Sequence, residues 1–213
     1  MHINFNHSNR LNAAVIPAGS LSPMVTLPTY DNLISDVSDA LAQHFQRWIA
    51  EHDGDEIYAY VIYATPLVSN IAISVLTEQG LQRVASDYRT KHGYEETLEQ
   101  LRMDLRWSVA DTPYCGDYQE LFASVNERLN AMMPYVDSLD VDDPAFTTHT
   151  DKLYSILVAA LNHFRNHTLS GTTRPMLYVD FGDMSNEERL AFIEQCNEQE
   201  LVEWYNSSIE MQG

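Results

Sequence analysis

Residues 56–65 read Glu-Ile-Tyr-Ala-Tyr-Val-Ile-Tyr-Ala-Thr, a run rich in β-branched and aromatic side chains that has the length of a β-strand. Pro66 follows directly and closes the run, because proline lacks the N–H that a central strand needs. A second apolar run, Ile71–Leu76, comes after a short turn. Two such runs joined by a short turn predict a β-hairpin.

Helical patterns flank the hairpin. Before it, apolar residues recur every three or four positions from Leu33 to Trp48, with Asp31 as the expected N-cap. After it, Thr77 is expected to cap a second helix, which ends at Gly93. Each helix carries one apolar stripe, which is typical of a helix that packs against a core.

More helices are expected in the second half of the chain. Asp117-Tyr-Gln-Glu120 resembles a capping box, which marks the N-terminus of a helix, and Ser185-Asn-Glu-Glu188 is another. Between them, apolar residues from Leu153 to Phe164 form one helical stripe.

Two further strands complete the expected sheet. Residues 101–107 alternate apolar and charged side chains with a period of two, and residues 176–181 are mostly apolar. The order of elements predicts a single α+β domain over residues 29–213, with a mainly antiparallel sheet of about four strands packed with five to six helices. Residues 1–28 are rich in Asn, Ser and Pro and are expected to form a loosely ordered or docked arm.

The charge of the chain is strongly unbalanced. Lys and Arg number 12 against 31 Asp and Glu, which gives a formal net charge of −19. The imbalance grows along the chain, from −6 over residues 1–106 to −13 over residues 107–213. Such a charge repels nucleic acids and anionic membranes and speeds association with basic partners, so we expect neither a nucleic-acid nor a membrane partner.

Several patterns bear on the compartment and on cofactors. No stretch approaches the roughly 18–20 apolar residues of a membrane span, and residues 1–7 lack the pattern of a secretory signal. The two cysteines have no paired spacing, which suits a reducing compartment. We therefore expect a cytoplasmic protein. No Gly-rich phosphate loop or dinucleotide fingerprint is present, so no cofactor is expected.

The most distinctive segment is Leu105-Arg-Trp-Ser-Val-Ala-Asp-Thr-Pro-Tyr114. It resembles the central Arg-Trp-Ser-x-Ala-Asp-x-Pro-Tyr motif of a bacterial domain-of-unknown-function family. Thr77-Glu-Gln-Gly-Leu81 and residues 179–190 are similar to flanking pieces of that family, and the resemblance covers roughly residues 33–206. It implies a gene that lies near polymorphic or contact-dependent toxins, and hence an immunity role.

This central motif, residues 105–114, has two readings. Arg106, Asp111 and Tyr114 could form a ligand site, because guanidinium groups bind carboxylates and phosphates in a fork. In the structural reading, Trp107 is core, Asp111 and a proline support a turn, and Arg106 pairs with Asp104 or Asp111.

Acidic residues of the second half are the expected surface for a basic partner. The predicted partner-binding residues are Asp137, Asp140, Asp142, Asp143, Glu187, Glu188, Glu194 and Glu198. A calcium loop is not expected in residues 137–143, because the required Gly and terminal Glu are missing. The other reading of these residues is a solvated acidic surface.

No catalytic or metal-binding signature emerges. His163 and His167 share a helix face, but spacing supplies no third ligand and His149 is the only nearby candidate, so no metal site is expected. Nucleophile motifs are absent. The leading hypothesis is a non-enzymatic immunity-type protein that binds a basic toxin domain, a nuclease or other secreted effector, and occludes its active site. The alternatives are an enzyme or ligand-binding protein built on Arg106, Asp111 and Tyr114, and a structural or regulatory module.

Overall fold

The computed structural model describes residues 27–169, 174–182 and 184–210. Nearly all of the expected N-terminal arm, residues 1–26 of 1–28, lies outside the described residues. The elements in chain order are α1 (Leu33–Glu51), β1 (Ile57–Ala64), β2 (Ile71–Thr77), α2 (Glu78–Lys91), α3 (Leu98–Leu105), the 3₁₀ helix η1 (Gln119–Phe122), α4 (Ala123–Ala131), α5 (Met133–Val136), α6 (Pro144–His167), β3 (Met176–Phe181), α7 (Asn186–Cys196) and α8 (Gln199–Glu210).

A three-stranded mixed sheet with the order β2-β1-β3 lies at the centre of the described chain. The predicted hairpin is confirmed, because β1 and β2 pair antiparallel with Ala64 opposite Ile71. The third strand differs from the expectation, since β3 pairs with β1 in parallel, with Met176 opposite Ala59. The α+β class is therefore right, whereas a mainly antiparallel sheet of about four strands is wrong.

Residues 101–107 were expected to form a strand and instead lie largely in helix α3. Thr97 caps this helix by accepting a 3.1 Å hydrogen bond from the Gln100 N–H. Leu101 and Leu105 lie four residues apart, so the segment also has a helical apolar stripe, and α3 packs it against α2. The period of two competes with this stripe over only seven residues, and packing on α2 favours the helix.

An extended segment that follows the central motif lies beside β2. Cys115 forms an isolated antiparallel bridge with Ser74. The Gly116 N–H donates to the Ile73 carbonyl at 2.8 Å, and the Val75 N–H donates to the Tyr114 carbonyl at 3.4 Å. The C-terminal end of the central motif thus lies along the outer edge of β2.

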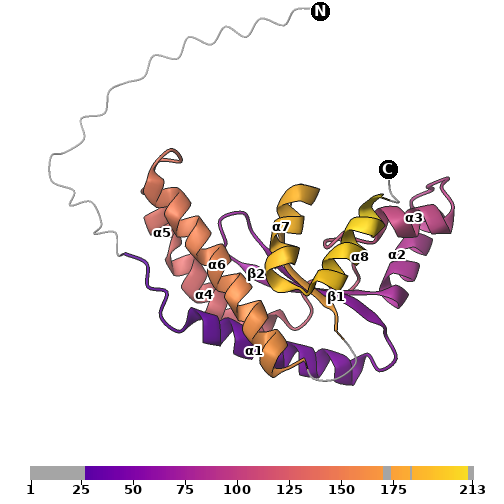
Figure 1. Cartoon of the computed structure of the whole chain (residues 1–213), viewed down its shortest axis with the longest axis horizontal. Coiled ribbons are helices and arrows are strands. Elements are labelled where there is room, and N and C mark those ends of the chain that lie inside the picture. The colour runs from indigo at the N-terminus through magenta and orange to yellow at the C-terminus, as the bar shows by residue number, and fades with distance from the viewer. Residues whose placement is uncertain (1–26, 170–173, 183, 211–213) are drawn as a thin grey trace, which may run out of the picture.

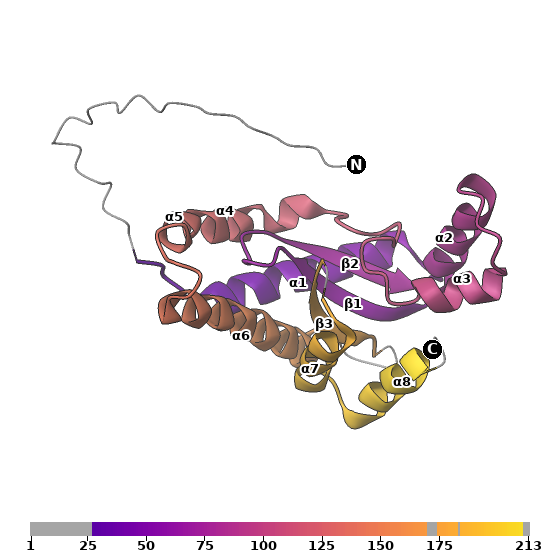
Figure 2. The same cartoon turned by 90° about the horizontal axis from the view of Figure 1, so that it is seen from above.

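Helices cover both faces of the sheet. Figure 1 shows α1 on one side of the strands and α7 and α8 on the other. Figure 2 shows α2 and α3 side by side at one end of the molecule, with α4 and α5 at the other end. Tyr60 and Ile62 of β1 belong to the larger apolar core with α1, α4 and α6, whereas Ala59 and Val61 face a smaller core with α7 and α8. A strand that is buried on both faces explains the almost unbroken apolar run of β1.

Two of the predicted helix starts are confirmed. The Thr77 hydroxyl accepts a 2.9 Å hydrogen bond from the Gly80 N–H at the start of α2. At the start of α7, Ser185 and Glu188 form the reciprocal capping box, with the Ser185 N–H donating to Glu188 at 2.8 Å.

Two other predicted helix starts are wrong. The N-cap of α1 is Asn32 rather than Asp31, and Arg128 of α4 donates to the Asp31 carbonyl at 2.6 Å. The Asp117–Glu120 segment forms no capping box, because Tyr118 adopts a left-handed conformation there and opens only the 3₁₀ turn, with α4 beginning at Ala123. Among the described helices, none combines the length and the apolar character needed to cross a bilayer.

Candidate functional site

Arg106 of the central motif is bound to the first residue of α2. Its guanidinium donates to Oε1 of Glu78, at 2.7 Å from Nη1, and lies 4.8 Å from the centroid of the Tyr58 ring. Arg102 holds the other oxygen of the same carboxylate at 2.9 Å. The expected pairing of Arg106 with Asp104 or Asp111 is therefore wrong, because Glu78 takes that place.

Asp111 binds the opposite end of α2. The Tyr88 hydroxyl donates to Oδ1 of Asp111 at 2.8 Å, and the Ser108 hydroxyl donates to Oδ2. The hydrogen bond to this carboxylate raises the pKa of Tyr88. Asp111 thus fixes the turn between Ser108 and the extended segment and ties that turn to the helix.

Tyr114 reaches two further segments. Its hydroxyl donates to Oδ2 of Asp55 at 2.6 Å and accepts from Nη2 of Arg83 at 3.3 Å. The ring edge contacts Trp48 and His52, with centroid distances of 5.3 and 4.9 Å. Burial, followed by the hydrogen bond to Asp55, raises the pKa of Tyr114.

Gly80 permits this close approach of the Tyr114 ring to α2. A Cβ atom at Gly80 would lie 3.0 Å from the Thr77 hydroxyl and 3.3 Å from the Tyr114 ring. Both distances are shorter than ordinary contacts, so the capping hydroxyl and the ring would each have to shift by a few tenths of an ångström. The Thr77–Leu81 segment and the central motif are therefore one packing unit.

The three predicted ligand-site residues do not share a cavity. Arg106, Asp111 and Tyr114 contact α2 at Glu78, Tyr88 and Arg83 respectively. The buried Trp107 lies on the other side of the motif and donates to the Ser208 hydroxyl of α8 at 2.9 Å. The geometry shows a segment that fastens α2 to the sheet and to α8, and a ligand site at these residues stays a prediction.

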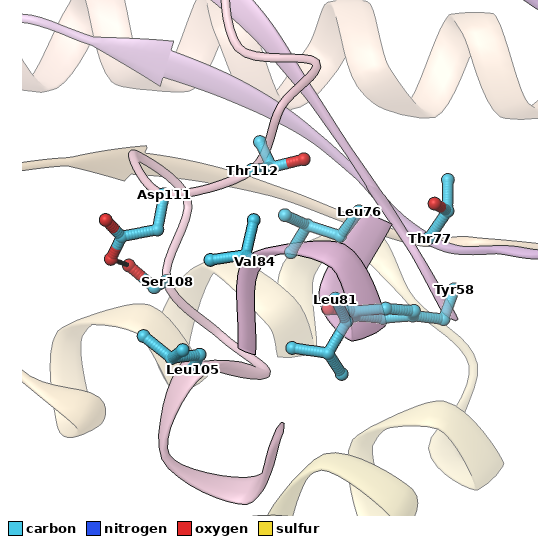
Figure 3. A pocket seen from close by; sticks show the side chains of 9 residues that line it. All are labelled: Tyr58, Leu76, Thr77, Leu81, Val84, Leu105, Ser108, Asp111 and Thr112. Atoms are coloured by element: carbon cyan, nitrogen blue, oxygen red, sulfur yellow. Dashed lines mark hydrogen bonds between the residues drawn. The ribbon is translucent and has the colours of Figure 1, made fainter. Parts of the chain in front are cut away.

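A small cavity lies between the motif, α2 and the hairpin (Figure 3). Its volume is about 10 Å³, and it is lined by Tyr58, Leu76, Thr77, Leu81, Val84, Leu105, Ser108, Asp111 and Thr112. A space of this size holds about one water molecule. The Ser108 hydroxyl is bonded to Asp111 at one side of the cavity, and the cavity is too small for a metabolite.

The predicted acidic residues of the loop before α6 are largely free. Asp137, Asp140 and Asp142 are exposed, whereas Asp143 caps α6 by accepting a 2.8 Å hydrogen bond from the Ala145 N–H. Val141 stands between the acids with 68% of its surface exposed. The loop therefore presents one exposed apolar side chain in a segment that carries three exposed acidic residues.

The second acidic group lies on and after α7. Glu187 and Glu194 are exposed, and no ion pair to them is found among the described residues. Glu188 belongs to the α7 capping box, and Glu198 pairs with Arg174 at 3.0 Å. Two of these four residues thus have structural roles, and two are free to meet a partner.

Most of the basic residues form ion pairs with carboxylates of the same chain. Of the eleven Lys and Arg among the described residues, seven form ion pairs with carboxylates. Their charge is cancelled locally, so the remaining surface carries most of the excess negative charge of the chain.

His149, His163 and His167 do not come together in the described part of the chain. His163 and His167 stack with a centroid distance of 4.0 Å, while the buried His149 hydrogen bonds to the Tyr30 hydroxyl at 2.5 Å. Within the described residues, no group of three or more His, Cys, Asp or Glu could hold a metal ion.

Two cavities large enough for a metabolite were not predicted from the sequence. One, of about 370 Å³, includes Trp48, His52 and Asp55 in its wall. The other, of about 400 Å³, includes Arg165. Their residues come from segments distant in sequence, and the chain shows no local motif at either. At the first cavity the local sequence His52-Asp-Gly-Asp55 is typical of a helix end and does not indicate a site.

Comparison with known proteins gives a family but no function. No curated protein matches the chain, and no solved structure matches it either. A family model described as a domain of unknown function, DUF4303, matches residues 37–200. This span covers most of the chain and includes the whole central motif, so the protein belongs to the DUF4303 family.

Proposed function

We propose that this protein is an immunity-type protein that binds a basic toxin domain in the cytoplasm and neutralises it by covering the active site of the toxin. The observation that carries the proposal is the exposed acidic loop before α6, in which Val141 stands among Asp137, Asp140 and Asp142. An apolar anchor surrounded by charges is a common design of protein interfaces.

The charge balance supports a protein partner of opposite sign. Seven of the eleven described basic residues are paired internally, so the free surface is dominated by carboxylates. A surface of one sign accelerates encounter with a basic protein and rejects nucleic acids and anionic membranes. The immunity role that the family resemblance of the central motif implies gives the same partner, by association alone.

Glu187 and Glu194 of α7 offer a second contact region. Both are exposed and unpaired among the described residues. We expect this region to contribute after the acidic loop has made the first encounter.

The test is co-expression with the product of the gene directly upstream. Growth arrest by that product, relieved by this protein, supports the proposal. A product without toxicity, or toxicity that this protein does not relieve, contradicts it. Association with the purified toxin should slow as salt is raised, because exposed charges are screened over about 8–10 Å at physiological ionic strength.

A matched pair of triple variants tests the acidic loop. Asp137→Asn, Asp140→Asn and Asp142→Asn together remove three exposed charges and leave the α6 cap at Asp143 in place. The control removes three exposed charges before and within the first turn of α3, with Glu95→Gln, Glu96→Gln and Glu99→Gln. The loop variant should slow association about tenfold and the control far less. Equal association rates for the two variants would show that the acidic loop is not part of the interface.

A further inference from the structure

Arg165 differs from the other half-buried arginines of the described chain. Each of the others has a carboxylate within ion-pair distance; they are Arg102, Arg106, Arg128 and Arg189. Arg165 has none among the described residues. In a chain with 31 acidic residues, a partly desolvated guanidinium without its own carboxylate is unexpected.

The side-chain hydrogen bond of Arg165 goes to a neutral acceptor. Nη2 donates to Oδ1 of Asn197 at 2.9 Å. The same oxygen accepts the Leu177 N–H at 2.9 Å, and the Asn197 amide nitrogen donates to the Leu177 carbonyl. Asn197 is therefore fully occupied at the edge of β3 and adds no charge. Burial lowers the pKa of Arg165, in keeping with an incompletely compensated cation.

Arg165 lines a hollow between the end of α6 and the start of α8. The volume is about 400 Å³, within the range of small-molecule sites. The lining residues are Arg165, Asn166, Leu169, Arg174, Pro175, Glu198, Glu200 and Leu201. Arg174 and Glu198 bind each other at 3.0 and 3.2 Å, so these two charges cancel.

The remaining lining fixes the chemistry of a ligand. Arg165 offers a fork of donors that matches a carboxylate, and Leu169, Pro175 and Leu201 offer apolar surface. Glu200 in the same wall, which has no ion pair among the described residues, disfavours a multiply charged anion such as phosphate. We propose that this hollow binds a small organic monocarboxylate with an apolar body, and that Arg165 holds its carboxylate.

The probe is 4-methylpentanoate, and the readout is the Nε–H resonance of Arg165 in the full chain, identified by its loss in Arg165→Lys. A saturable shift below about 10 mM is expected. Leucinamide has a similar apolar body and no carboxylate, and inorganic phosphate has charge and no apolar body; neither should move the resonance. No shift with 4-methylpentanoate, or a larger one with phosphate, overturns the proposal.

Variants separate binding from fold. Arg165→Gln keeps a donor for Asn197 and removes the charge, and it should weaken binding of 4-methylpentanoate at least about tenfold. Arg89→Gln makes the same charge change at an exposed position of α2 and should leave affinity unchanged. Unchanged affinity in Arg165→Gln overturns the proposal. If Arg165→Gln does not fold, Leu201→Ala is measured instead. Loss of this apolar part of the wall should weaken the binding of 4-methylpentanoate about threefold or more. An unchanged affinity in Leu201→Ala also overturns the proposal.

Discussion

The Tyr114 hydroxyl donates a 2.6 Å hydrogen bond to Oδ2 of Asp55, across 59 positions of sequence. Asp55 lies in the loop between α1 and β1, and Tyr114 ends the central motif. The same hydroxyl accepts from Arg83 of α2, so one phenol joins the loop, the motif and the helix.

Replacing Tyr114 by Phe should lower the free energy of unfolding by about 1–2 kcal/mol, because it removes a hydrogen bond to a carboxylate and keeps the buried ring. Urea denaturation measures the change. Tyr94→Phe is the control, since Tyr94 is 48% exposed and its hydroxyl has no hydrogen-bond partner among the described residues; it should change stability by less than about 0.5 kcal/mol. Similar values for both variants would show that the Asp55 bond adds nothing.

A double-mutant cycle should show that Arg106 and Glu78 are coupled by about 1 kcal/mol or more. Their side chains are only 23% and 25% exposed, so solvent screens the pair weakly. The comparison is the Lys91–Asp87 pair of α2, which is 66% and 41% exposed and should show about 0.3–0.5 kcal/mol. Coupling energies are read from urea denaturation of the single and double Gln and Asn variants. Equal couplings for the two pairs would argue against a special role for Arg106.

Because His44 is buried, the free energy of unfolding should decrease as the pH falls. Burial lowers the pKa of His44 from 6.5 to about 4. Between pH 6.5 and pH 4, His44 binds a proton in the unfolded chain but stays neutral in the folded chain. The contribution of His44 to stability is therefore complete above about pH 6.5 and is lost as the pH falls towards 4. The total loss is about 3 kcal/mol.

The comparison for this effect is His44→Gln, measured by urea denaturation at about pH 7 and pH 5. The stability gap between the parent protein and the variant should shrink by about 2 kcal/mol at the lower pH. Burial also lowers the pKa of His149, but that residue is present in both proteins and cancels. A gap that does not change with pH would contradict the assignment.

Asp180→Asn should destabilise the protein by about 3–5 kcal/mol. Asp180 of β3 and Arg189 of α7 form an ion pair at 2.7 Å with side chains 3% and 13% exposed. The variant leaves Arg189 buried without a counter-charge, which is the costly outcome for such pairs. The double variant Asp180→Leu with Arg189→Met removes both charges and should be more stable than Asp180→Asn. Thermal or urea unfolding decides between them, and the reverse order would contradict the argument.

Local patterns predicted those parts of the fold that short segments determine. The hairpin, the Thr77 cap and the Ser185 capping box each depend on residues a few positions apart, and all three are confirmed. The parallel pairing of Met176 with Ala59 joins segments more than a hundred residues apart. Alternation and propensity do not encode which strand a distant run will join, so the sheet was expected to be mainly antiparallel.

The error at residues 101–107 has a different cause. Seven residues of alternating pattern also contain Leu101 and Leu105 at helical spacing, and the N-cap at Thr97 lies before the pattern. Here the contact with α2 decides between two readings that the local sequence allows.

The candidate sites depend even more on distant partners. Sequence singled out Arg106, Asp111 and Tyr114, but their partners Glu78, Tyr88 and Asp55 come from other segments. Arg165 becomes a candidate only because the structure shows that no described carboxylate pairs with it. The sequence pattern alone does not reveal this missing ion pair.

The extended segment beside β2 also determines how other chains can approach the sheet. An unpaired strand edge is a template for strand addition and for aggregation. On β2 that template is already occupied, because Tyr114 and Gly116 hydrogen bond to Val75 and Ile73. An incoming peptide would have to peel away the central motif, and with it the tie between Tyr114 and Asp55. A partner that reaches this side must therefore be recognised by side chains on the helices and loops, while the strand itself remains shielded from self-association.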